Sequence, residues 1–228
     1  MRLVQKDVNV SGDKHMKNRS KFIVAAIFLW IIGWMIPARA SVTDLQIGAA
    51  AKVVNSVYGV LELAKQTQWL RPGIDVFQNE LVVTADNSAS RLIFKDTTQL
   101  SMGSRAQVKL DRFVFDPNPS ASTLAISFVH GVFRFATGLL PKENYAIRTP
   151  SADLYVRGTV FTVLITPTGS ELISVESGTV YVRCRRTGVN VAVNAGQSTY
   201  IPSPNGSPQR PTASPPNPTV AHMDALLR

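Results

Sequence analysis

Few side chains in this sequence have the type and spacing that catalysis or metal binding requires. Beyond residue 40 there are two histidines, His130 and His222, and a single cysteine, Cys184. A hydrolase needs a nucleophile within reach of a base, and a metal site needs clustered His, Cys, Asp or Glu. His130 ends an apolar run just before Gly131, which is typical of a packed or turn residue. We therefore expect no enzyme, metal site or cofactor, and His130 is the one candidate base for an alternative envelope hydrolase.

Arginines offer a different chemistry, because a guanidinium group binds carboxylate or phosphate through two parallel hydrogen bonds. The four candidate ligand-binding residues are Arg148, Arg157, Arg183 and Arg185. If they faced one way, they could hold an anionic ligand rich in carboxylate or phosphate groups. The alternative is a solvated sheet face on which arginines pair with nearby carboxylates, and the pattern favours this second interpretation.

The residues that carry these arginines have the periodicity of β-strands. Val180, Val182 and Cys184 alternate with polar residues, and a second alternating run, residues 189–194, follows the turn residues 186–188. This arrangement predicts a β-hairpin with Cys184 buried on its apolar face. Glycines recur every eight to eleven residues between 158 and 196. We therefore expect an all-β fold of short antiparallel strands in one β-solenoid-like or sandwich-like domain.

Residues 45–64 give conflicting signals. Apolar residues recur at helical spacing, but the valines of this stretch favour a strand, and Gly59 would weaken a helix. The pattern alone leaves the choice between helix and strand open.

The first forty residues have the features of a secretory signal. A basic stretch precedes the uncharged apolar run 22–36, and small residues at Ala38 and Ala40 predict cleavage after Ala40. The alternative is an uncleaved N-terminal membrane anchor, and Met16 is a possible true start. Either way we expect the rest of the chain to be periplasmic or secreted.

Most of the formal net charge of +9 belongs to this signal. Seven of the 24 Lys and Arg residues, but only two of the 15 Asp and Glu residues, precede residue 41, which leaves a net charge of +4. A modest charge outside the cytoplasm argues against a nucleic-acid partner.

The other end of the chain is rich in proline. Seven of the fourteen prolines lie between residues 202 and 219. Such composition is typical of an extended spacer, so we expect residues 202–228 to form a disordered tail and the β domain to end at residue 201.

The stretch from Arg148 to Phe161, RTPSADLYVRGTVF, has the features of a strand corner. Pro150 removes a backbone donor and so belongs at a strand boundary, and Gly158 permits a bulge or a turn. Its two motifs, Thr149-Pro150-Ser151-Ala152 and Arg157-Gly158-Thr159, resemble the most recognisable stretch of the FecR-type domain family, the extracytoplasmic part of iron-dicitrate sensors. The resemblance continues, in the family's order, through residues 72–103, 110–117, 130–138, 175–182 and 194–201.

The resemblance implies an all-β domain within residues 41–201 that senses a signal or binds an envelope protein or glycan, with no catalytic or ligand residues to carry over. Sigma-factor regulators of this family have a cytoplasmic helical segment longer than residues 1–21, so anti-sigma activity is not expected. We interpret Thr149, Pro150, Ala152 and the Arg157-Gly158-Thr159 motif as structural turn residues. In this interpretation Arg157 pairs with a carboxylate or with backbone carbonyls and fixes the turn.

Overall fold

The computed structural model describes residues 45–228, apart from 63–64 and 115–121. The predicted signal segment, residues 1–40 with the cleavage residues Ala38 and Ala40, lies outside the described residues. Within the described ranges, no helix has the length and apolar character needed to cross a membrane.

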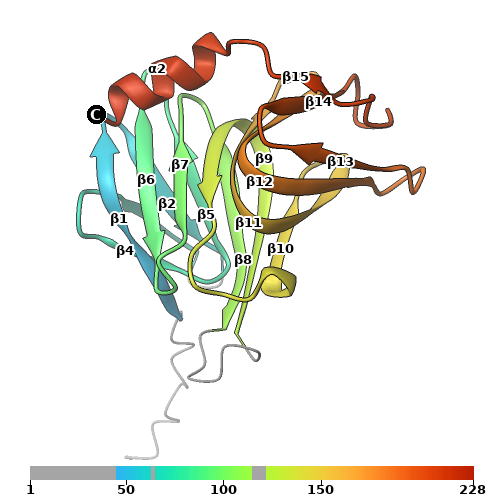
Figure 1. Ribbon diagram of the computed structural model, residues 1–228. Helices are drawn as coiled ribbons and strands as arrows, with labels where there is room; N and C mark the ends of the chain where they lie inside the picture. Colours follow the sequence, from blue (N-terminus) through green and yellow to red (C-terminus); the bar gives the residue numbers. More distant parts are fainter. Residues whose placement is uncertain (1–44, 63–64, 115–121) are drawn as a thin grey trace, which may run out of the picture. The chain divides into compact units, whose positions relative to one another are not determined.

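The described residues form fifteen strands of one mixed, hydrogen-bonded sheet that folds back on itself (Figure 1). Its first half contains β2 (Val57–Leu61), β3 (Gln66–Trp69), β5 (Glu80–Thr84), β8 (Gln107–Val114), β10 (Tyr145–Arg148) and β13 (Asn190–Asn194). Its second half contains β1 (Gln46–Val54), β4 (Asp75–Phe77), β6 (Ala89–Phe94), β7 (Gln99–Met102), β14 (Gln197–Ile201) and β15 (Thr212–Ala213). A short 3-10 helix, η3 (Lys142–Asn144), precedes β10. The prediction of an all-β domain is confirmed.

Three long strands belong to both halves: β9 (Thr123–Ala136), β11 (Ala152–Ile165) and β12 (Glu171–Cys184). The N-terminal part of β9 pairs with β8 and β10, and its C-terminal part pairs with β7 and β11. Each long strand has one glycine at positive φ where it passes between the halves, namely Gly131, Gly158 and Gly178. Because L side chains rarely adopt this backbone conformation, glycine lets each strand bend without ending.

The glycine spacing predicted that all strands would be short, and this is wrong for the three long strands. Gly158 and Gly178 lie inside strands of 14 residues and do not separate strands. The pairing is also not wholly antiparallel, because β10 runs parallel to β9.

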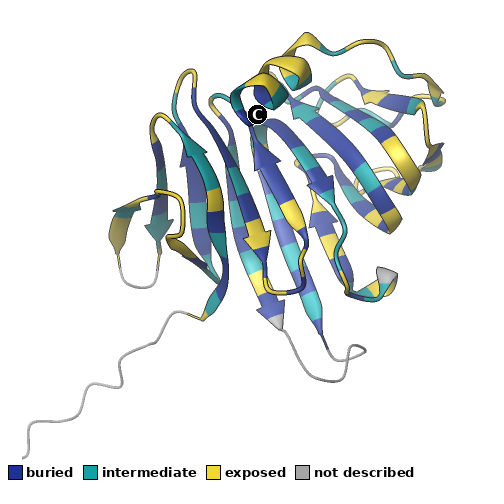
Figure 2. Ribbon diagram, turned by 60° about the vertical axis from the view of Figure 1, so that its left-hand side comes forward, coloured by how far each residue is buried: buried dark blue, intermediate teal, exposed yellow. Residues whose placement is uncertain are grey.

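The two halves face each other across one apolar core, which makes the fold sandwich-like. Rings from the two halves meet there: Phe128 stacks on Phe133 at 4.4 Å between centroids, and Phe94 stacks on Phe113 at 6.3 Å. These side chains are at most 2% exposed. Burying each large apolar side chain contributes about 1.5–3 kcal/mol. Figure 2 shows buried residues along the strands, interrupted by exposed ones, and many exposed residues at turns and in the C-terminal segment.

The ambiguous stretch 45–64 forms β1 and β2 where it is described. Asn55, at φ +58°, turns the chain between them, so β1 joins the second half and β2 the first. Gly59 is explained by packing: a Cβ there would lie 1.6 Å from the carboxylate of buried Glu80. The helical spacing of the apolar residues was coincidental.

The predicted hairpin around residues 186–188 is present. Strands β12 and β13 pair in antiparallel register, with Val182 opposite Val191 and Tyr181 opposite Ala192. Cys184 is fully buried, and its thiol donates a hydrogen bond to the carbonyl of Gly206 at 3.4 Å.

The prediction of a disordered tail is wrong. Strand β15 pairs with β14, and the helix α2 (Pro218–Leu226) lies across the ends of β1, β6 and β7 (Figure 1). Asn217 caps the helix, because its side-chain oxygen accepts hydrogen bonds from the backbone N–H groups of Thr219 and Val220. Met223 and Leu227 are buried in a small separate apolar cluster with Ala89 and Val132. The β domain therefore includes residues beyond 201, because this short helix has apolar side chains that cover sheet surface.

Candidate functional site

The Thr149-Pro150-Ser151-Ala152 motif forms a tight turn between β10 and β11. The backbone N–H of Thr149 donates to the carbonyl of Ala152, and the N–H of Ala152 donates to the hydroxyl of Thr149, both at 2.9 Å. Pro150 lies outside the strand ladder, where its missing N–H leaves no acceptor unpaired. The hydroxyl of Thr149 is thus used for folding.

Two charged side chains stabilise this turn: Glu171, the first residue of β12, and Arg185, the residue that follows β12. Nη2 of Arg185 donates to the carbonyls of Thr149 and Pro150, at 2.8 Å and 2.5 Å. The carboxylate of Glu171 accepts from the N–H of Ser151 at 2.8 Å. Glu171 is fully buried, and this burial raises the pKa of its carboxyl group, although the Ser151 and Thr149 hydrogen bonds and the charge of Arg185 partly offset the rise.

The Arg157-Gly158-Thr159 motif is a bulge inside β11 and not a turn. The pairing of β11 with β12 shifts register between Arg157 and Val160, and Gly158 has φ +56°. Arg157 is exposed, with no hydrogen bond or ion pair to any described residue. The prediction that Arg157 fixes the turn is therefore wrong, and Arg185 has that role.

Three of the four candidate arginines lie on one exposed sheet face. Arg148 and Arg183 lie on either side of Asp153 in the cross-strand register, and Arg157 follows Asp153 on the same side of β11. Arg148 forms an ion pair with Asp153 at 3.6 Å. Arg183, like Arg157, has no partner within the described chain. The fourth, Arg185, is committed to the turn and is not part of a ligand site.

Two tyrosines that the sequence reasoning missed occupy the centre of this face. Tyr155 and Tyr181 are direct cross-strand partners on β11 and β12, and they are 49% and 41% exposed. The signal was available, because Tyr155 alternates in phase with Asp153 and Arg157, opposite the buried Leu154 and Val156. We call the side of β8–β13 that carries these tyrosines and arginines the arginine–tyrosine face.

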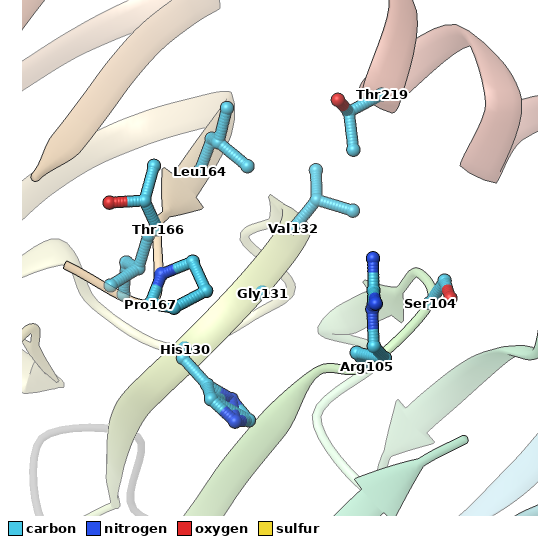
Figure 3. A pocket seen from close by; sticks show the side chains of 10 residues that line it. Ser104, Arg105, His130, Gly131, Val132, Leu164, Thr166, Pro167 and Thr219 are labelled. Carbon is cyan, nitrogen blue, oxygen red and sulfur yellow. The ribbon is translucent and has the colours of Figure 1, made fainter. Parts of the chain in front are cut away.

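A pocket of about 480 Å³ opens where β9 bends, away from the arginine–tyrosine face. Figure 3 shows Arg105 and Thr219 on one side, Thr166 and Pro167 on the other, and Val132 between them. The ring of His130 turns away from the centre of the pocket, and its Nδ1 has no hydrogen-bond partner in the described chain. Nothing at the pocket pairs His130 with a nucleophile.

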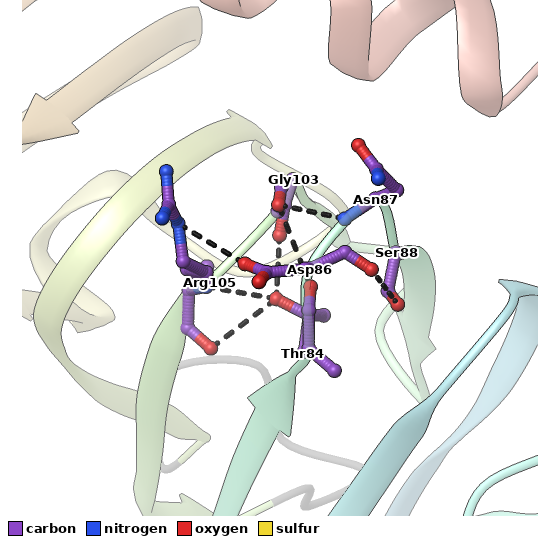
Figure 4. A network of polar contacts seen from close by, with 9 residues as sticks. Thr84, Asp86, Asn87, Ser88, Gly103 and Arg105 are labelled. Atoms are coloured by element: carbon purple, nitrogen blue, oxygen red, sulfur yellow. Dashed lines mark hydrogen bonds and ion pairs between the residues drawn. The ribbon is translucent and has the colours of Figure 1, made fainter.

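The polar groups beside this pocket hold loops together (Figure 4). The buried hydroxyl of Thr84 donates to the carbonyl of Gly103 at 2.5 Å and accepts from the N–H of Ala106 at 2.8 Å. Arg105 forms an exposed ion pair with Asp86 at 3.3 Å. Within the described ranges no group of three or more His, Cys, Asp or Glu side chains is placed to hold a metal ion.

The fold is an all-β domain whose most distinctive surface is a sheet face carrying tyrosine and arginine. Residues 80–181 match the family model described as FecR protein, so the chain carries a FecR-type domain, as its motifs predicted. This match supports a role in signalling or sensing.

Two crystal structures of a candidate anti-sigma factor from Parabacteroides distasonis, at 2.50 Å and 1.65 Å resolution, are similar to this chain. They are 16% and 15% identical in sequence, each with a TM-score of 0.48, and the match covers 59% of this chain and 59% of theirs. The comparison with curated proteins gives no match.

Proposed function

We propose that this protein is an extracytoplasmic, non-catalytic FecR-type module that binds a component of the cell envelope through its arginine–tyrosine face. The observation that carries the proposal is the exposed pair Tyr155 and Tyr181, flanked by the guanidinium groups of Arg157 and Arg183, which have no partner among the described residues. Exposed tyrosine and arginine are the side chains most enriched in binding hot spots. Neither tyrosine packs in the core, so the fold itself does not account for them.

The family motifs support a binding role indirectly. Thr149, Ala152 and Gly158 take part in the turn and the bulge, so their contacts are accounted for by folding. The proposal of an extracytoplasmic location rests on the signal-like residues 1–40, and it includes either a cleaved signal or an uncleaved anchor.

A sensor of a small anion such as ferric dicitrate, acting on a sigma factor, is the second candidate. It has weaker support, because Arg148 is paired with Asp153 and Arg185 with the turn carbonyls, which leaves Arg157 and Arg183 on an open face. An envelope hydrolase has the least support, because His130 has no partner at Nδ1 in the described chain.

Cosedimentation with a purified envelope fraction tests the proposal. The full chain should sediment with the envelope at physiological salt, and Tyr155→Ala/Tyr181→Ala should remain in the supernatant. Tyr200→Ala removes a tyrosine of similar exposure, 40%, from β14 and should behave as the parent chain. If the parent chain, the double tyrosine variant and Tyr200→Ala sediment equally, the envelope binds a surface other than the arginine–tyrosine face. If the parent chain does not sediment, the proposal is contradicted.

A further inference from the structure

The arginine–tyrosine face is organised as rows that run across the strands. One row contains, from β8 to β13, Lys109, Ser127, Arg148, Asp153, Arg183 and Asn190. The next contains Arg112, Ala125, Ala146, Tyr155, Tyr181 and Ala192. A third, shorter row contains Arg157, Thr179 and Asn194.

From β9 to β13 the middle row is a flat strip in which only the tyrosines are large, and Arg112 lies at its β8 end. The alanines on both sides of the pair are small, so the two rings stand above the sheet and can be approached from its flanks. From β9 to β13 this row spans four strand spacings, about 19 Å at ~4.8 Å each. A site of this length suits an extended chain better than a small molecule.

The arginine–tyrosine face has a net positive charge, and some of its arginines have no ion-pair partner among the described residues. Four arginines lie on it, Arg112, Arg148, Arg157 and Arg183, against two aspartates, Asp111 and Asp153. Asp111 accepts a hydrogen bond from Ser127 at 2.6 Å, and Asp153 pairs with Arg148. Lys109 is neutralised by Glu62 at 2.6 Å. Among the described residues, free guanidinium groups therefore remain on both sides of the tyrosine row, at Arg157 and at Arg183.

The backbone of β9–β12 is not available to a ligand, whereas β13, among the described strands, pairs only with β12 and leaves one edge of the face open. Strands β9, β10, β11 and β12 each pair with a neighbour on both sides, so only side chains are presented. A peptide that binds a sheet by strand addition needs unpaired backbone groups at an edge. A ligand that lies across the strands, and not along the edge of β13, must therefore be recognised by side chains.

Building on the proposed function, we propose that the arginine–tyrosine face binds a carboxylate-bearing polysaccharide that lies across strands β9–β13. The C–H face of a sugar ring packs on an aromatic ring, which is the contact that Tyr155 and Tyr181 offer. Carboxylate groups along the chain meet the planar forks of Arg157 and Arg183 in the rows on either side. The combination of rings in a line with flanking guanidinium groups matches a linear, acidic sugar polymer in both shape and charge.

Isothermal titration calorimetry on the full chain with polygalacturonate tests this assignment, with neutral dextran and poly-glutamate as comparison polymers. Polygalacturonate should bind, dextran should not, and poly-glutamate should bind at least tenfold more weakly. Tyr155→Ala/Tyr181→Ala and Arg157→Ala/Arg183→Ala should each weaken polygalacturonate binding at least tenfold. Tyr200→Ala and Arg210→Ala, which alter exposed residues elsewhere, should leave it unchanged, and thermal melting should show that every variant folds.

Three results would overturn the assignment: no binding of polygalacturonate, equal binding of poly-glutamate, or binding that survives loss of both tyrosines. The cosedimentation experiment separates this failure from failure of the proposed function. If the envelope still retains the chain through Tyr155 and Tyr181, the face binds something other than an acidic glycan. If envelope binding is also absent, both proposals fail.

Discussion

Gly178 lies against Gly158 where β11 and β12 bend together, so closely that a Cβ on Gly178 would be 2.5 Å from the carbonyl oxygen of Gly158. Both glycines have positive φ, +78° and +56°. The paired bends let two long strands contribute to both halves of the sandwich. They also place Tyr155, Arg157 and Tyr181 together on the first half, on one side of the bends.

Replacing Gly178 by alanine should cost more stability than replacing Gly158. A side chain at Gly158 meets no atom within 4 Å and suffers only backbone strain, about 1 kcal/mol, whereas one at Gly178 suffers the strain and a clash with backbone. We expect Gly178→Ala to lower the free energy of unfolding by about 2–4 kcal/mol. Urea denaturation of both variants checks the order, and equal losses would contradict it.

Arg185→Ala should destabilise the domain while its neighbour Arg183→Ala does not. Each change removes one positive charge, but only Arg185 donates hydrogen bonds to the turn carbonyls. Because Arg185 is exposed, water partly replaces these bonds, and the loss should be about 1 kcal/mol. Thermal melting of the two variants compares them directly, and a larger loss for Arg183→Ala would show that the turn does not depend on Arg185.

The buried carboxyl group of Glu171 should make the domain less stable as pH rises. Burial raises the pKa of this carboxyl group above its usual value of 4.5, so folding favours the neutral form. The stabilising effect of protonation is fully present below pH 4.5 and is lost as pH rises through the folded-state pKa. Glu171→Gln keeps an acceptor for the Ser151 N–H and removes the charge.

The stability of Glu171→Gln relative to the parent chain should therefore increase between pH 4.5 and neutral pH. Denaturant unfolding of both proteins across this range measures the difference. The pH-independent cost of the new amide cancels when slopes are compared. Parallel curves for the two proteins would mean that the Glu171 pKa does not differ between the folded and unfolded states.

Met223→Asp should detach α2 and leave the sandwich folded. Met223 is 1% exposed and belongs to the small cluster outside the main core, so its loss should unfold the C-terminal segment locally. Limited proteolysis should then cut within residues 202–217 much faster, with a loss of about 1–2 kcal/mol in global stability. His222→Asp adds the same charge at an exposed position of α2 and is the control. Equal cleavage of both variants would mean that Met223 does not anchor the helix.

The sequence predicted the features that depend on local alternation. Val180, Val182 and Cys184 lie on the buried face as their period of two required, and the turn after them joins β12 to β13. Pro150 marked the boundary between β10 and β11 because proline cannot donate to a strand ladder. The motif order also identified the FecR-type domain.

Features that depend on contacts between distant residues were beyond sequence reasoning. Arg185 reaches the turn at Thr149 across 36 positions, so nothing local distinguished it from Arg157, which lies only eight residues from Thr149. The pairing of Tyr155 with Tyr181 requires the register of β11 and β12. Proline content predicted an unfolded tail, but the Asn217 cap and the apolar side chains of residues 220–227 dock a nine-residue helix on the sheet.

Hydrogen exchange of the full chain, with and without the envelope fraction, tests most directly where this protein binds its partner. The account predicts slower exchange of backbone amides in β10–β13, around Tyr155 and Tyr181, with no change at α2 or beside His130. Protection confined to the His130 pocket or to α2, with β10–β13 unchanged, would contradict it.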